Sequence, residues 1–278
     1  MRYIAMNGLG NRFAIFDARS RPFRPDSEAV RRLADPKTGL GFDQMFVLEP
    51  SQAGELFMRM WNADGEEVGA CGNGARCVGW LLMEESGRDR ATFETAAGLL
   101  TASRAGPAAV TVDMGAPGLD WTQIPLSERM DTVRIELQVG PIDDPVLWGP
   151  GCVSMGNPHC VFFVDDAEAA PVTQVGPMIE YHPLFPQRTN VGFAQVKGRD
   201  RIRLRVWERG AGLTKACGTG ACAALVAAHR RGTTGREATL ELDGGELQIR
   251  WEADTVSSPG HVYMTGPVEL EHSGEISL

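Results

Sequence analysis

The sequence has 278 residues, of which 43% are hydrophobic and 23% are charged, and its formal net charge at pH 7 is −9. This is the composition of an ordinary globular protein of one large or two medium domains, and no apolar run approaches the roughly 18 residues of a membrane span. The N-terminus lacks the apolar core of a signal peptide, and the negative charge disfavours a nucleic-acid backbone as main partner. We therefore expect a cytoplasmic protein whose six cysteines do not form a disulfide framework.

Strand-like segments dominate the first half of the chain. Alternating, β-branched or aromatic residues predict strands at 11–18, 44–50, 56–64, 91–98 and 109–115. The stretch DSEAVRRLAD at 26–35 starts with an Asp/Ser cap and predicts an amphipathic helix. A second helix is predicted after Cys71, because Ala75, Val78 and Leu82 form an apolar face at helical spacing.

The second half contains similar elements. Strands are predicted at 159–166, 202–210, 238–251 and 261–266, and the LDGGEL stretch within the third of these predicts a hairpin. The segment GPMIEYHPLFP at 176–186 predicts a short helix that prolines end. After Cys217, the residues Ala221, Leu225 and Ala228 again predict a helix with one apolar face.

One short motif occurs twice, as ACGNGA at 70–75 and as ACGTGA at 216–221. Each copy follows a strand that ends in polar residues, leads into a helix and is followed by further strands, which indicates duplication. We predict an α+β fold of two pseudo-symmetric domains, each a curved, mostly antiparallel sheet wrapped around a central helix, with the active site in the cleft between them. The expected domains are residues 1–115 with 265–278, and residues 116–264.

The position of Cys71 and Cys217 at a helix start has chemical consequences. The first backbone N–H groups of a helix lack intrahelical partners and carry partial positive charge. They lower the pKa of a thiol and bind carboxylates, while glycines let the backbone approach such a ligand. Two thiols on opposite faces of one carbon suit the inversion of a stereocentre, since one removes a proton and the other returns one. From the residues alone, a single-cysteine transferase and a non-catalytic binding protein remain alternatives.

The remaining cysteines and the lysines point to no cofactor. We expect Cys77, Cys152, Cys160 and Cys222 to be buried core residues. The cysteine spacings do not match those of structural zinc sites, and glycine motifs for phosphate or dinucleotide binding are lacking. Lys215, two residues before Cys217, keeps a pyridoxal enzyme open as an alternative. We nevertheless expect a reaction that needs neither cofactor nor metal.

Eight blocks of the sequence resemble diaminopimelate epimerases. They are GLGNRF at 8–13, GLGFDQ at 39–44, NADG at 62–65, ACGNGARC at 70–77, SMGNPHCV at 154–161, RTNVGF at 188–193, WERGAGLTKACGTGACAA at 207–224 and VYMTGP at 262–267. They run nearly end to end, in the family's order and spacing. The resemblance implies an isomerase that interconverts LL- and meso-diaminopimelate for lysine and peptidoglycan synthesis, without pyridoxal phosphate or metal, as a homodimer.

The resemblance also implies roles for individual residues. Cys71 and Cys217 match the two acid/base cysteines, and His159 and Glu208 match a polar pair near them. The residues whose backbone binds the reacting carboxylate are matched by Gly72, Asn73, Gly218 and Thr219. Substrate-binding positions are matched by Asn11, Gln44, Asn62, Asn157, Asn190, Glu208 and Arg209. Amides that both donate and accept, with an arginine for a carboxylate, suit a substrate that carries two carboxylates and two ammonium groups.

Three residues depart from the family's pattern. Asn7 and Arg12 stand where the usual HGLGNDF block has His and Asp, which changes the charge near Asn11. His272 replaces a Tyr linked to dimer packing, so a different dimer interface is expected. Proline and hydroxyproline racemases and phenazine-type isomerases share the expected architecture. The racemases lack the GFDQ, NADG and WERGAG blocks as a set, and the phenazine-type proteins lack the cysteine pair.

Overall fold

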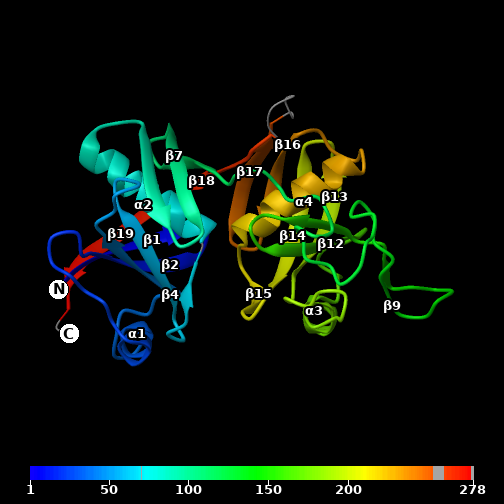
Figure 1. Cartoon of the computed structure of the whole chain (residues 1–278), viewed down its shortest axis with the longest axis horizontal. Coiled ribbons are helices and arrows are strands. Elements are labelled where there is room, and N and C mark those ends of the chain that lie inside the picture. Colours follow the sequence, from blue (N-terminus) through cyan, green and yellow to red (C-terminus); the bar gives the residue numbers. More distant parts are fainter. Residues whose placement is uncertain (70, 253–259, 277–278) are drawn as a thin grey trace. The chain divides into compact units, whose positions relative to one another are not determined.

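The computed structural model of the chain describes residues 1–69, 71–252 and 260–276 (Figure 1). The chain divides into two compact units, one made of Met1–Asp113 with Thr265–Leu278 and the other of Met114–Met264. We refer to them as the first and the second unit. In both, strands outnumber helices.

The first unit is a mostly antiparallel sheet with two helices, α1 (Ser27–Ala34) and α2 (Gly72–Ser86). Its strands are β1 (Arg2–Gly8), β2 (Asn11–Asp17), β3 (Gln44–Glu49), β4 (Phe57–Asn62), β5 (Glu67–Val68), β6 (Arg90–Thr95), β7 (Gly98–Gly106), β8 (Ala109–Asp113) and β19 (Glu269–Glu275), and β18 (Val262–Pro267) returns the chain to it. Hydrogen bonds join the strands in the order β19–β1–β2–β3–β4–β6–β7–β8. The pairs β2/β3 and β4/β6 are parallel, and the others are antiparallel.

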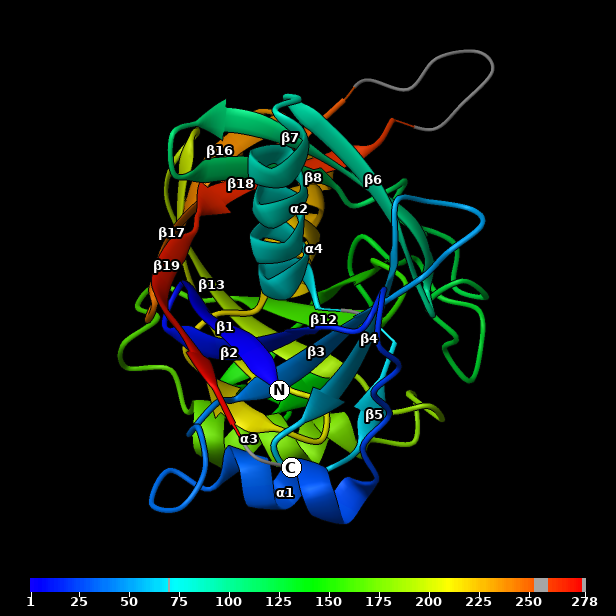
Figure 2. The same ribbon diagram turned by 90° about the vertical axis from the view of Figure 1, so that its left-hand side faces the viewer.

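The two helices of this unit cover opposite faces of β1–β4, as Figure 2 shows. Successive strand residues face opposite sides of a sheet. Phe46 of β3 therefore meets the start of α2, whereas Phe16 and Val47 pack with Val30 of α1. The Asp26 side chain caps α1 by accepting a hydrogen bond from the Ala29 N–H at 2.8 Å.

The second unit repeats this plan with α3 (Val172–Glu180) and α4 (Gly218–Arg230). Its strands are β9 (Gln138–Val139), β10 (Leu147–Trp148), β11 (Gly151–Ser154), β12 (Pro158–Phe163), β13 (Asn190–Gly198), β14 (Arg201–Glu208), β15 (Gly212–Thr214), β16 (Glu237–Leu242) and β17 (Gly245–Trp251). The pairs β12/β13 and β14/β16 are parallel, just as β2/β3 and β4/β6 are in the first unit. The predicted fold class, two pseudo-symmetric α+β units, is confirmed.

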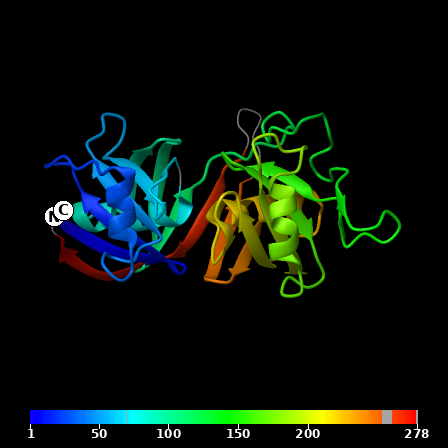
Figure 3. The same cartoon turned by 90° about the horizontal axis from the view of Figure 1, so that it is seen from below.

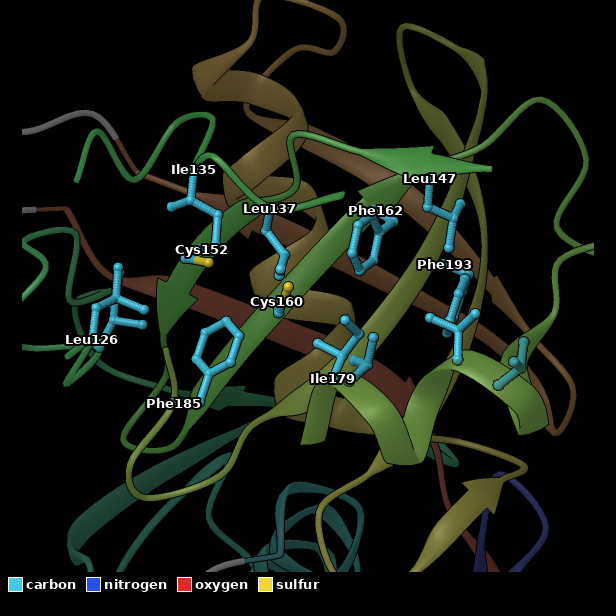
Figure 4. Packing of buried hydrophobic residues seen from close by; sticks show 14 residues of the cluster. Leu126, Ile135, Leu137, Leu147, Cys152, Cys160, Phe162, Ile179, Phe185 and Phe193 are labelled. Atoms are coloured by element: carbon cyan, nitrogen blue, oxygen red, sulfur yellow. The ribbon is translucent and has the colours of Figure 1, made fainter. Parts of the chain in front are cut away.

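Helices α2 and α4 are the central helices of their units (Figure 1), and α1 and α3 lie on the outside of the strands, on the side that Figure 3 shows. Every residue of α4 from Gly220 to Ala228 is buried. Helix α3 packs Ile179 against a cluster of apolar side chains that includes Phe162 and Phe193 (Figure 4). Burial of such clusters against both faces of the strands stabilises the fold.

Most predicted elements are confirmed. The segment 26–35 forms α1, helices follow Cys71 and Cys217, and the LDGGEL stretch joins β16 to β17. The predicted helix at 176–186 is wrong in its bounds, because α3 begins at Val172 and ends at Glu180. Apolar packing of Val172, Val175 and Ile179 holds this helix together although Pro177 lacks an N–H group.

Several strands were not predicted, namely β1, β5, β7, β9, β10, β11, β13, β15 and β19. Five consecutive residues at the start of β13 are buried, so this strand lacks the alternation that marks a half-buried strand. The opposite holds for β19, whose side chains are mostly exposed and polar. Both strands form because their neighbours β12, β14 and β1 offer backbone hydrogen bonds.

Candidate active site

Cys71 caps the N-terminus of α2. Its backbone is extended (φ −149°, ψ 104°), and its Sγ accepts a hydrogen bond from the Gly74 N–H at 3.3 Å. A Cβ on Gly74 would lie 2.2 Å from Cζ of Phe46, so glycine is needed for the helix start to rest on β3. The first-turn N–H groups, among them those of Gly72 and Asn73, lie at the positive end of α2, where they suit an anion.

The turn between β1 and β2 lies against the start of α2. A Cβ on Gly8 would lie 3.2 Å from the carbonyl oxygen of Asn73, and Gly8 pairs with Asn11 across the turn. Leu9 and Gly10 have φ values of 58° and 81°, as a tight two-residue hairpin turn requires. Asn11 is therefore held at the turn that meets the first turn of α2.

Gln44 and Asn62 form a pair at the same end of the neighbouring strands. They lie opposite each other in β3 and β4, and Nε2 of Gln44 donates to Oδ1 of Asn62 at 2.8 Å. The parallel register of β2 and β3 places Phe13 beside Gln44, so Asn11 is two residues away along β2. The structure thus brings Asn11, Gln44 and Asn62 to one end of the sheet.

A buried cation lies behind the first turn of α2, and the sequence analysis missed it. Arg76 is 0% exposed, and its Nη1 donates to Oδ1 of Asn73 at 3.0 Å while its Nε donates to the Pro267 carbonyl at 3.4 Å. This contact ties the Asn73 side chain to the buried guanidinium one turn further along α2. An arginine between the apolar residues Ala75 and Val78 was the signal that could have drawn attention to it.

Cys217 occupies the same position at the start of α4. Its backbone is again extended (φ −119°, ψ 106°), and its side chain is buried. Its Sγ lies 3.7 Å from Oγ1 of Thr219. A Cβ on Gly220 would lie 3.2 Å from both Sγ of Cys217 and Cγ2 of Val206, so this glycine lets the thiol and β14 approach the helix start. Gly218 and Thr219 supply the first-turn N–H groups of this half.

The expectation that a helix start lowers the thiol pKa is wrong for Cys217. Burial raises the pKa of this thiol well above its usual value, and the neighbouring Glu208 carboxylate raises it further, whereas the Thr219 hydroxyl acts in the opposite sense. Burial also raises the pKa of Glu208, which accepts a hydrogen bond from Oγ1 of Thr214. Desolvation therefore outweighs the helix start, and Cys217 is held as a neutral thiol.

Asn157 and His159 connect to the same helix start through hydrogen bonds. Nε2 of His159 donates to Oδ1 of Asn157 at 3.0 Å, and Nδ2 of Asn157 donates to Oγ1 of Thr219 at 3.4 Å. The direction follows because an amide oxygen only accepts. Burial lowers the pKa of His159 to about 3, and the charge of Arg209 acts in the same sense. The neutral imidazole thus orients Asn157.

Asn190 and Arg209 are linked to each other. Nδ2 of Asn190 donates to the Pro158 carbonyl at 2.9 Å, and its Oδ1 accepts a hydrogen bond from the Arg209 N–H at 3.0 Å. Asn190 is buried and fixes the backbone at the end of β14. The guanidinium of Arg209 is exposed, and its Nη1 donates to the Gln187 carbonyl at 2.9 Å. Arg209 is therefore held at its backbone while most of its side chain faces solvent.

The sequence-predicted residues form two sets that match position by position. The spacing along the chain is the same for Asn11 and Asn157, Gln44 and Asn190, Asn62 and Glu208, and Cys71 and Cys217. The strand registers agree, since β2/β3 pairs Phe13 with Gln44, and β12/β13 pairs His159 with Asn190. Each unit thus brings together one helix-capping cysteine and three polar side chains at strand ends.

The residues that depart from the family's pattern are accommodated within the first unit. Nδ2 of Asn7 and Nε of Arg12 both donate to the Glu271 carboxylate at 3.3 Å, so the added charge of Arg12 is balanced there. Oδ1 of Asn7 also accepts a hydrogen bond from the Gly10 N–H at 2.8 Å, which supports the turn before Asn11. His272 lies edge-on to the Tyr3 ring, with 5.8 Å between the ring centroids.

The other four cysteines are core residues, as expected: Cys77, Cys152, Cys160 and Cys222 are all 0% exposed. Burial raises the pKa of Cys77 to about 12, which keeps this thiol neutral. Among residues 1–69, 71–252 and 260–276, no three or more His, Cys, Asp and Glu side chains cluster as metal ligands would. No helix in the part of the chain that the structure describes is long and apolar enough to cross a membrane.

Comparisons with known proteins are consistent along the whole chain. A family model described as diaminopimelate epimerase matches residues 3–119 and 151–271. The diaminopimelate epimerase of Phenylobacterium zucineum is 60% identical over 274 residues, which cover 99% of this chain and 97% of that protein. The diaminopimelate epimerase of Caulobacter vibrioides is 54% identical over 286 residues, which cover 99% of this chain and 96% of that protein.

Solved structures of lower identity share the fold. A hydroxyproline epimerase from Agrobacterium vitis with bound trans-4-hydroxy-L-proline has a TM-score of 0.68 at 16% identity, covering 100% of this chain and 92% of that one. A phenazine biosynthesis protein from Bacillus anthracis has a TM-score of 0.68 at 15% identity, covering 100% of this chain and 99% of that one. The expectation that such proteins share this architecture is confirmed, and the likeness concerns the fold alone.

Proposed function

This chain belongs to the diaminopimelate epimerase family, and from this premise we propose that it interconverts LL- and meso-diaminopimelate without a cofactor or a metal ion. The reaction inverts one α-carbon of the substrate and serves lysine and peptidoglycan synthesis. One observation carries the proposal: a cysteine caps the central helix in both units, at equivalent positions. Inversion needs an acid and a base on opposite faces of one carbon, which explains why the motif occurs twice.

In the proposed mechanism, Cys71 and Cys217 act as an acid–base pair on one substrate. One thiolate takes the α-proton, and the other thiol delivers a proton to the opposite face, so the roles exchange with the direction of reaction. Burial and Glu208 keep Cys217 in the thiol form. In the direction in which Cys217 is the acid, Cys71 is the base. After one turnover Cys71 carries the proton and Cys217 is the thiolate, which is the state that the opposite direction needs.

The helix starts bind the reacting carboxylate in this proposal. When the α-proton leaves, negative charge spreads into that carboxylate, and preorganised N–H donors stabilise it more in the transition state than in the ground state. The donors are the backbone N–H groups of Gly72 and Asn73 in the first unit, and of Gly218 and Thr219 in the second. The glycines leave room for the carboxylate to approach the backbone.

The remaining polar residues recognise the rest of the substrate. His159 keeps Asn157 oriented toward Thr219, and Glu208 tunes Cys217 and accepts hydrogen bonds from an ammonium group. The amides of Asn11, Gln44, Asn62, Asn157 and Asn190 and the guanidinium of Arg209 serve the amino and carboxylate groups. Arg209 is suited to the distal carboxylate because its planar fork can donate two parallel hydrogen bonds.

We also propose that the protein works as a cytoplasmic homodimer, in which each chain carries both thiols. We further propose that the chain has two functional halves. The half with Cys71 consists of residues 1–115 with 265–278, and the half with Cys217 consists of residues 116–264. Sedimentation equilibrium of the purified chain measures the oligomeric state, and a monomer at all concentrations would contradict the dimer.

The activity is tested by incubating the purified protein with LL-diaminopimelate in deuterated water, with no cofactor added. We expect meso product that carries one solvent deuterium at the inverted α-carbon, because the acid donates a solvent-exchanged proton. L-proline and trans-4-hydroxy-L-proline serve as control substrates and should give no inversion. Absence of meso product from a folded protein, or faster inversion of proline, would reject the proposed substrate.

A further inference from the structure

A buried carboxylate that the proposed mechanism does not use lies at the end of α3. Glu180 is 3% exposed. Its Oε2 accepts a hydrogen bond from Nε1 of Trp207 at 2.7 Å, and its Oε1 accepts one from the Gly210 N–H at 3.0 Å. Hydrogen bonds to a charged acceptor are among the stronger contacts in a protein, and a buried carboxylate is stable only when it is satisfied in this way.

The two donors flank the pair of residues that the mechanism does use. Trp207 precedes Glu208, and Gly210 follows Arg209, so one carboxylate holds both sides of the turn that carries them. Asn190 adds a third attachment by accepting the Arg209 N–H. These three hydrogen bonds fix the backbone of the turn between β14 and β15, and none of them uses the side chain of Glu208 or Arg209.

Helix α3 gives Glu180 a rigid base. Ile179, the preceding residue, is part of the apolar cluster against β12 and β13 that Figure 4 shows. A Cβ on Gly176 would lie 2.4 Å from Cγ of Trp207, so the helix packs directly on this ring. The helix and the tryptophan can therefore come close enough for the indole to reach the carboxylate only because residue 176 is glycine.

The first unit lacks this arrangement. The residue equivalent to Glu180 is Ala34 at the end of α1, and the residue equivalent to Trp207 is Trp61, which also packs beside its helix. Alanine offers no carboxylate to the indole or to the turn after β4. The carboxylate thus occurs in the unit whose turn carries Glu208 and Arg209, and not in the unit whose equivalent turn carries Asn62 and Ala63.

We propose that Glu180 is a positioning residue, which holds the turn 207–210 so that Glu208 and Arg209 meet the substrate in a fixed geometry. The inference rests on the proposed function. Arg188, whose Nη1 lies 3.8 Å from Oε1, is half exposed and serves as a counter-charge rather than as part of the turn. Loss of the Glu180 carboxylate displaces Arg209, which raises KM, and Glu208, which lowers kcat.

The test uses Glu180→Gln in the full-length protein. Trp207 and Gly210 donate to different oxygens of Glu180, and in glutamine one of these oxygens is replaced by an NH2 group that cannot accept, so one of the two donors loses its partner. We expect kcat/KM for LL-diaminopimelate to fall about tenfold to a hundredfold, with a rise in KM and a fall in kcat. Trp207→Phe, which removes one of the two donors, should give a smaller loss, and the double variant should be less than additive. Trp61→Phe is the matched control and should stay within about twofold of wild type.

Two readouts separate positioning from loss of stability. Partial unfolding lowers the apparent kcat but leaves KM unchanged, whereas a displaced Arg209 raises KM. Amide hydrogen exchange at Gly210 should speed up in Glu180→Gln but not in Trp61→Phe. Kinetic constants within about twofold of wild type would overturn the proposal, and so would a fall in kcat at constant KM. If the wild-type protein fails to turn over diaminopimelate, the proposed function is wrong. In that case hydrogen exchange still tests the role of Glu180, and an unchanged rate at Gly210 in Glu180→Gln would show that Glu180 does not hold the turn 207–210.

Discussion

The helix starts at Cys71 and Cys217 have the same backbone conformation but different electrostatic environments. In both, a cysteine with extended backbone precedes a glycine-rich first turn. The first unit surrounds its cysteine with neutral amides at the strand ends, and Arg76 is buried behind the first turn. In the second unit, the position of Asn62 is taken by the carboxylate of Glu208.

The same contrast extends to neighbouring positions. His159 stands in the second unit where the first has Phe13, and Cys222 where the first has Arg76. In the proposed mechanism the α-carbon needs two like groups on its two faces, and the equivalent helix starts at Cys71 and Cys217 are assigned that role. The rest of the substrate is not symmetric about that carbon, so its recognition requires that the two units differ. The two units thus share their backbone geometry but differ in the charges around the helix start.

The largest expected effect comes from removing either thiol. Cys71→Ala and Cys217→Ala should each lower epimerisation by about 10²–10⁴-fold or more, because neither an acid nor a base alone inverts the carbon. The double variant should be hardly worse than either single one, since residues that act as a unit are not additive. Product formation from LL-diaminopimelate measures this, and Cys222→Ala is the control for a buried thiol outside the pair.

A near wild-type rate for either single variant would remove that cysteine from the chemistry and leave its helix start as a carboxylate site at most. Solvent isotope exchange without inversion in one single variant would distinguish the two thiols. It would identify the thiol that remains as the base for the isomer supplied.

A smaller loss is expected from Arg209→Lys. Lysine keeps the charge but cannot donate two parallel hydrogen bonds to a carboxylate, so kcat/KM should fall about ten- to a hundredfold, mostly through KM. Arg199→Lys, an exposed arginine in the turn before β14, is the matched control and should leave the kinetics unchanged. Equal kinetic constants for Arg209→Lys and wild type would place the distal carboxylate elsewhere.

The contrast between His159 and Phe13 predicts a difference in acid stability. The pKa of His159 is lowered to about 3 in the folded protein, whereas an unfolded histidine has a pKa of about 6.5. The unfolded state therefore binds the proton first as the pH falls below about 6.5, and the free energy of unfolding decreases until the folded pKa is reached. Protonation of His159 in the unfolded state should lower the free energy of unfolding by about 2 kcal/mol between pH 7 and pH 5.

Replacing His159 by the residue of the other unit, His159→Phe, should remove this part of the pH dependence. Urea unfolding at pH 7 and pH 5 measures it as the change in the free energy of unfolding. His272→Phe, at an exposed histidine, is the control. The same loss of stability between the two pH values in His159→Phe and wild type would show that His159 is charged in the folded protein.

The smallest effect concerns the charge beside Cys217. Glu208 raises the pKa of this thiol, so Glu208→Gln should lower it, while burial continues to hold it above the usual value. The rate of alkylation of Cys217 by iodoacetamide, followed against pH in a Cys71→Ala background, should then rise at lower pH than with Glu208 present. An unchanged pH profile would mean that Glu208 carries no charge next to Cys217. The two helix starts would then not differ through this carboxylate.

The parts of the fold with local signals were predictable. An Asp cap and an apolar face identify α1, and the glycines of LDGGEL identify the hairpin β16–β17. The paired motif around Cys71 and Cys217 identified the duplication and the candidate thiols. Strands such as β13 and β19 carry no alternating pattern, because one is buried on both faces and the other is largely exposed, so only their neighbours decide that they are strands.

The local sequence is enough to predict which residues stand at each helix start, because capping and helix formation depend on residues a few positions apart. It did not determine the protonation of Cys217. The position of Cys217 at a helix start favours a lowered thiol pKa, yet burial and the carboxylate of Glu208 raise it. Only the tertiary structure brings Asn157 and Glu208 to the start of α4 and lets Glu180 bind the turn 207–210. Desolvation and charge act through space between segments far apart in sequence, and no local pattern records them.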